Sequence, residues 1–191
     1  MPIVMPPIPE DVRDCFVEGV CDELWEDGAL VGAVAKFPER VDGVSIYSLG
    51  LQQIEDGEWV RDGAGAGWRV YWTAGGRAVI GDVRIGASGK VSLASVHSGP
   101  RALEAVGKID AKRNQPGLRD LQYTFCLLRI PGVSLELCWY KPLASGEHYF
   151  YSSQDGVKEI ERKRIYEGEN LYEIVKRLAP LAREFDRLEP A

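Results

Sequence analysis

Histidine and cysteine are scarce in this chain of 191 residues. It has two histidines, His97 and His148, and four cysteines. No CxxC, HExxH or HxH spacing occurs among them. Because zinc sites are commonly built from such closely spaced ligands, the sequence predicts no metal site, and nothing in it indicates a cofactor. The cysteines are Cys15, Cys21, Cys126 and Cys138.

Four cysteines in a chain of this length are too few for a disulfide scaffold. Cysteine is commonly a small buried hydrophobic residue, so we interpret all four as reduced thiols. Cys126 and Cys138 lie on either side of Pro131 and Gly132, which predict the turn of a hairpin. The two side chains are placed to face each other there, and a buried thiol pair is preferred to a disulfide or a pair of metal ligands.

Long apolar runs are also absent. The longest, GALVGAVAKF at residues 28–37, is about half the length of a membrane-spanning helix. The chain does not open on a basic segment followed by an apolar one, as a signal peptide does. These features predict a cytoplasmic protein that does not enter a membrane.

The chain has no excess of positive charge. It carries 23 lysines and arginines against 29 aspartates and glutamates, for a net charge of −6 and a pI near 5.1. Nucleic-acid binding depends on basic side chains that neutralise phosphates, so a general affinity for nucleic acid is excluded. The basic run at residues 158–164, KEIERKR, also holds two glutamates and is interpreted as a solvated segment.

One glycine run resembles a phosphate-binding loop in composition only. In DGAGAGW the glycines stand at positions 63, 65 and 67, and an aromatic strand pattern follows. A dinucleotide fingerprint needs GxGxxG at the start of a helix, and a P-loop needs lysine followed by serine or threonine. The run is therefore predicted to be a connector whose small residues let two backbone segments pass closely.

The overall amino-acid composition is that of a folded protein. Hydrophobic residues make up 45% of the chain and charged residues 27%, and the length suits a single domain. Four prolines within residues 1–9 predict an extended, apolar arm. Helical spacing of apolar residues then predicts a helix over residues 10–26.

The rest of the chain favours strands with helices between them. Apolar, β-branched composition predicts strands at residues 29–37 and 44–50, with a turn at 38–43. From Trp68 the apolar residues alternate, Gly75 and Gly76 mark a hairpin, and a third strand returns at residues 91–96 before a helix at 97–113. Strands at 121–130, 133–140 and 147–153 precede a helix at 170–188, with a kink or break expected at Pro180.

These elements predict an α+β fold. After residue 68 the order is βββ-α-βββ-α, and hairpin-linked strands form an antiparallel sheet of five to eight strands. The N-terminal, internal and C-terminal helices are expected to cover one face of this sheet.

Two surfaces are candidates for binding a partner. The outer side of the first helix is acidic and is either solvated surface or a docking surface for a basic partner. Neighbours in a strand point to opposite faces, so the pairs Tyr71 with Trp72 and Trp139 with Tyr140 cannot share one core. Such aromatics are either covered by the N-terminal arm and helix, or they form a partner surface or ligand cleft. The candidate binding residues are Asp14, Glu18, Asp22, Trp72 and Trp139.

One group of residues is a candidate for catalysis. Nucleophilic catalysis needs a nucleophile, a base and an orienting group, and only His97, with Ser98 beside it and Cys126 on a later strand, offers these types. Helix capping explains the same serine. We therefore expect a non-enzymatic, acidic protein-binding module, for example an inhibitor, immunity or accessory protein, acting as a monomer or homodimer. The alternative is a small-ligand-binding protein or a hydrolase-like enzyme near His97 and the sheet aromatics.

Overall fold

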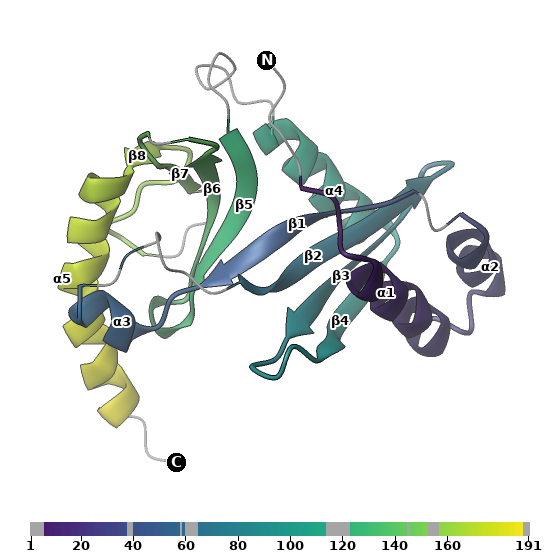
Figure 1. The fold of residues 1–191 in the computed structure, drawn as a ribbon, viewed down its shortest axis with the longest axis horizontal. Helices are drawn as coiled ribbons and strands as arrows, with labels where there is room; N and C mark the ends of the chain where they lie inside the picture. The colour runs from purple at the N-terminus through teal and green to yellow at the C-terminus, as the bar shows by residue number, and fades with distance from the viewer. Residues whose placement is uncertain are drawn as a thin grey trace. The chain divides into compact units, whose positions relative to one another are not determined.

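The computed structural model describes residues 6–37, 40–57, 59, 65–113, 123–144, 146–152 and 157–188. Its strands form one sheet of eight in the order β4-β3-β2-β1-β5-β6-β7-β8 (Figure 1). Consecutive strands from β2 to β4 and from β5 to β8 pair in antiparallel fashion, whereas β1 and β5 are parallel. The predicted α+β class with a mostly antiparallel sheet is confirmed.

The elements follow the predicted order closely after residue 68. The first βββα group consists of β2, β3, β4 and α4. The second group has four strands before its helix, because it includes a short strand, β8, in addition to the three that were predicted. The strands are β1 Val41–Ser48, β2 Gly65–Ala74, β3 Arg77–Ile85, β4 Val91–Ser98, β5 Tyr123–Ile130, β6 Leu135–Pro142, β7 Tyr149–Ser152 and β8 Ile165–Glu167. The helices are α1 Glu10–Glu23, α2 Gly28–Lys36, α3 Leu51–Glu55, α4 Pro100–Arg113 and α5 Gly168–Leu188, with a 3-10 turn at Pro131–Val133.

Residues 28–36 form the helix α2, and the strand predicted at 29–37 is wrong. Asp27 caps this helix, because its carboxylate Oδ1 accepts a hydrogen bond from the Leu30 amide at 3.0 Å. Leu30 and Val34, one turn apart, are both buried. The turn predicted at residues 38–43 is also too long, since β1 already begins at Val41.

The contacts divide the chain into two compact units, and β1 passes from one to the other. Unit 1 comprises Met1–Val4, Ile46–Gly65 and Leu121–Ala191, and unit 2 comprises Met5–Ser45 and Ala66–Asp120. The single domain expected from the chain length stays a prediction.

The core of unit 2 lies on both faces of its part of the sheet. On one face α1 buries Val12, Phe16 and Val20. These side chains pack with Trp68, Val70, Trp72, Val79, Val83 and, from the N-terminal segment, Ile8. On the other face α4 contacts β3 and β4, and its Ala102, Val106 and Ile109 are buried. The expectation that helices cover one face is therefore wrong, and Tyr71 and Trp72 are both buried because each face has its own cover.

The core of unit 1 forms between α5 and the strands β5 to β7. Leu171, Val175 and Ala179 of α5 are fully buried and pack with Cys126, Leu128, Trp139 and Phe150, among others. Residues on the opposite face are also buried, as shown by Phe125 and Tyr140, whose ring centroids lie 5.5 Å apart in an edge-to-face arrangement. The helix continues through Pro180 to Leu188, so a break there is excluded.

The strand register separates the two central cysteines. Cys126 pairs with Trp139, and Cys138 pairs with Leu127. Directly paired residues share a face and neighbours along a strand alternate, so the two thiols point to opposite faces. The expectation that they face each other is wrong, and all four cysteines of the chain are free.

Gly65 and Gly67 of the glycine run belong to the strand β2, so the connector predicted for the run is wrong at these residues. Only one of the two glycines is sterically required. A Cβ on Gly65 would meet nothing within 4 Å. A Cβ on Gly67, whose φ is +153°, would lie 2.1 Å from the carbonyl oxygen of Val83 on the neighbouring strand. The predicted close passage of two backbone segments is confirmed at Gly67, while Gly63 lies outside the described residues.

Gly67→Ala is expected to lower the free energy of unfolding by about 2–3 kcal/mol, because the new methyl group forces β2 away from β3. Gly65→Ala is the matched control and is expected to change it by less than about 0.5 kcal/mol. Urea unfolding followed by circular dichroism measures both. Equal effects of the two substitutions would contradict the steric argument.

Candidate functional site

The strand β4 lies at one end of the sheet, and α1 packs closely against it. Gly19 of α1 allows this approach, because a Cβ at that position would lie 2.3 Å from Cδ2 of Leu93. The thiol of Cys15, one turn earlier, lies near the backbone of Leu93. The first half of β4 is thus held by α1.

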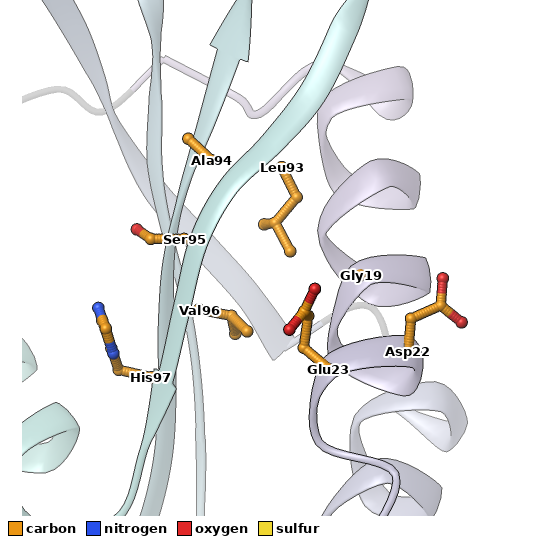
Figure 2. Close-up of a pocket in the computed structure, with 8 residues that line it drawn as sticks. All are labelled: Gly19, Asp22, Glu23, Leu93, Ala94, Ser95, Val96 and His97. Carbon is orange, nitrogen blue, oxygen red and sulfur yellow. The ribbon is translucent and has the colours of Figure 1, made fainter.

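A β-bulge changes the course of β4 at its centre. Val83 pairs with Leu93 and Asp82 with Ser95, so Ala94 is the additional residue. Figure 2 shows the result: Leu93 and Val96 point toward α1, whereas Ala94, Ser95 and His97 point to the other side of the strand.

A hollow of about 410 Å³ lies between α1 and β4. Leu93 and Val96 give it an apolar floor, and Gly19 adds a part of its wall. The carboxylate of Glu23 points toward β4, while Asp22 points outward from the helix (Figure 2). Both carboxylates belong to exposed residues, so the hollow combines an apolar floor with an acidic rim.

The outer side of α1 continues this acidic rim. We call Asp11, Asp14, Glu18 and Asp22 the acidic stripe, and all four are exposed. Asp14, Glu18 and Asp22 follow one another at four-residue intervals, which makes them neighbours on the helix surface. Within the described part of the chain, none of these three carboxylates forms an ion pair. The stripe is an uncompensated negative surface.

The acidic stripe also affects the nearest thiol. Burial raises the pKa of Cys15, and the carboxylates of Glu18 and Asp11 raise it further, against the opposing effect of the Leu93 backbone hydrogen bond. A raised pKa keeps the thiol protonated at neutral pH, and a thiol is a weaker nucleophile than a thiolate. Cys15 therefore fits a structural contact better than a reactive one.

A second hollow, of about 520 Å³, lies on the α4 side of β4. Apolar side chains form much of its lining, including Leu24, Ile80 and Ala102. His97 and Arg101 add its polar part. Residues 96 and 97 line both hollows, so the two hollows adjoin at the second half of β4, one extending toward α1 and the other toward α4.

The structure does not assemble a catalytic triad from His97, Ser98 and Cys126. His97 and Ser98 are the last residues of β4 and not part of the helix opening, which begins at Pro100. As neighbours in a strand they point to opposite faces. Cys126 is fully buried in the core of unit 1. Among the described residues, no hydrogen bond orients the imidazole of His97.

The two tryptophans proposed for binding are core residues. Trp72 is 1% exposed and is covered by Ile8 and α1, which is the first of the two alternatives that the sequence left open. Trp139 is 0% exposed, and its Nε1 donates a hydrogen bond to Nδ1 of His148 at 3.0 Å. Neither side chain is accessible to a partner in this structure.

Two surface features were not predicted from the sequence. Trp25, in the turn after α1, is 70% exposed. The strand β4, with the sequence VSLASVHS, has no lysine, arginine, acidic residue or proline although it ends the sheet. The absence of charge is visible in the sequence, but only the strand order shows that it falls on an edge.

Other kinds of site find no support in the described residues. They include no group of three or more histidine, cysteine, aspartate or glutamate side chains arranged to hold a metal ion. None of the helices there combines the length and apolar character needed to cross a membrane. Comparisons of the chain with protein-family models, with curated proteins and with solved structures returned no match.

Proposed function

We propose that this chain is a non-enzymatic protein-binding module that recognises a basic partner protein through the acidic stripe and the hollow between α1 and β4. The observation that carries the proposal is the position of Glu23 and Asp22 at the rim of a hollow floored by Leu93 and Val96. Inhibitor, immunity and accessory proteins are the classes that such a module fits.

Two physical effects support this function. Uncompensated carboxylates attract a basic protein over the distance of a Debye length and raise its association rate. An apolar floor supplies surface that is removed from water when the partner docks. Trp25 adds a residue type that is enriched among the strongest contacts of interfaces.

A small-ligand-binding or hydrolase-like function is the second candidate. The hollow on the α4 side has a volume typical of ligand sites and is lined by His97, Ser98 and Arg101. The lack of an orienting partner for His97 among the described residues favours ligand binding over catalysis in that case.

The test uses a variant in which Asp14, Glu18 and Asp22 are all replaced by lysine. These residues are exposed, so the melting temperature is expected to change by only a few degrees. A basic partner captured from a lysate of the source organism by the wild-type chain is expected to associate with the variant at least about tenfold more slowly at low salt. Stopped-flow or surface plasmon resonance measures the rates and their salt dependence.

The matched control replaces Glu159, Glu169 and Glu173 by lysine. These glutamates are exposed in unit 1, and the control changes the net charge by the same amount. It is expected to associate much as the wild type does. If both variants slow association equally, the effect is one of net charge and the acidic stripe is ordinary solvated surface.

A further inference from the structure

The outer edge of β4 lacks the usual protection of an edge strand. Proteins commonly block such edges with lysine, proline or a covering segment, because unpaired backbone groups invite another strand. The strand β4 has neither residue type, and in the part of the chain that the structure describes no further strand pairs with it. The first half of β4 is held against α1 by the contacts of Leu93 with Cys15 and Gly19, and the bulge at Ala94 interrupts the strand. Residues 95–98 are therefore the part of the edge that is available for pairing with another strand.

The surroundings of residues 95–98 match the two faces of an added strand. Side chains of an extended segment alternate between the two faces of a sheet. A segment lying beside this half of β4 would direct one set of side chains to the hollow with Glu23 and the other set to the hollow with Ile80 and Ala102. The first hollow suits a basic side chain, and the second suits an apolar one.

We propose that the partner binds by strand addition: an extended segment with alternating basic and apolar residues pairs with residues 95–98 of β4. Backbone hydrogen bonds to the edge supply sequence-independent binding, and the two hollows select the side chains. The inference rests on the proposed function, because it assigns the partner's binding mode at the same surface. The inference goes beyond the proposed function because strand addition requires backbone pairing, whereas binding by attraction between charges does not.

The probe is a synthetic peptide, TKVKVKT, whose lysines lie on one face of a strand and whose valines lie on the other. Two analogues carry N-methyl groups, one on the amides of the three lysines and one on the amides of residues 3, 5 and 7. Alternate amides of a strand point to the same side, so only one of the two sets can pair with β4. Isothermal titration calorimetry with the full chain compares the three peptides.

Strand addition predicts that one analogue binds at least about tenfold more weakly than the parent peptide and that the other binds within about twofold of it. Hydrogen exchange is expected to slow at backbone amides within residues 95–98 when the parent peptide is bound. Glu23→Lys is expected to weaken binding of the parent peptide about fivefold or more, whereas the control Glu159→Lys is not.

Three outcomes overturn the inference: equal binding of both analogues and the parent, no binding of the parent at about 1 mM, or concentration-dependent protection of residues 95–98 without peptide. The third would mean that a second copy of the chain occupies the edge. If the triple lysine variant weakens peptide binding while both analogues bind as the parent does, strand addition fails and the acidic docking surface stands. If one analogue fails and the triple variant binds normally, strand addition stands and the acidic stripe does not contribute.

Discussion

Phe16→Ala is expected to lower the free energy of unfolding by about 3–5 kcal/mol. Phe16 is 0% exposed and lies at the centre of the buried side of α1. Its ring packs over the backbone of β3, where a Cβ added to Gly81 would come within 3.2 Å of Cε2. A glycine has no side chain that could move into the space left by the ring, so the cavity remains largely empty. Urea unfolding followed by far-ultraviolet circular dichroism measures the loss.

Phe16→Leu is the matched control for this substitution. Leucine keeps most of the apolar volume, so the expected loss is about 1–1.5 kcal/mol. An alanine variant as stable as the leucine variant would mean that α1 does not depend on this ring for its position on the sheet.

Trp139→Ala is expected to cost about 3–5 kcal/mol through the core of unit 1. The indole of Trp139 is fully buried and stacks on Phe150, with ring centroids 5.9 Å apart and an interplanar angle of 15°. It also donates the hydrogen bond to Nδ1 of His148. Alanine therefore removes a large apolar group and a hydrogen-bond donor together. The substitution removes one of the five tryptophans and so changes the fluorescence signal itself, and circular dichroism is therefore the measurement.

Trp139→Phe separates the two contributions. It keeps an aromatic ring but has no N–H group, so about 1–2 kcal/mol is expected to be lost with the hydrogen bond and the smaller ring. If the phenylalanine variant were as unstable as the alanine variant, the hydrogen bond to His148 would outweigh the packing of the ring, contrary to this assignment.

The two alanine variants also test whether the chain is a single domain. Phe16 belongs to unit 2 and Trp139 to unit 1. A single cooperative domain predicts one unfolding transition that both substitutions shift. Two transitions, each sensitive to only one substitution, would show that the units unfold independently.

Local patterns in the sequence were sufficient to locate most of the elements. Alternation at Trp68, Val70 and Trp72 predicts β2, and Gly75 and Gly76 adopt the positive φ values of 56° and 75° that a tight hairpin requires. Apolar residues at helical spacing predict α1, α4 and α5. The valine-rich composition of α2 favours a strand, but the cap at Asp27 and the burial of Leu30 and Val34, one turn apart, stabilise a helix there.

For the candidate site, the sequence by itself determined the acidic character of α1 and the absence of charge from VSLASVHS. Each follows from residue type and spacing along one segment. Only the tertiary structure decided that β4 ends the sheet, that Trp72 and Trp139 are buried, and that Glu23 lies over a hollow beside Leu93. Strand order, register and the cover of each sheet face depend on contacts between residues far apart in the chain, and a pattern within one segment carries no information about them.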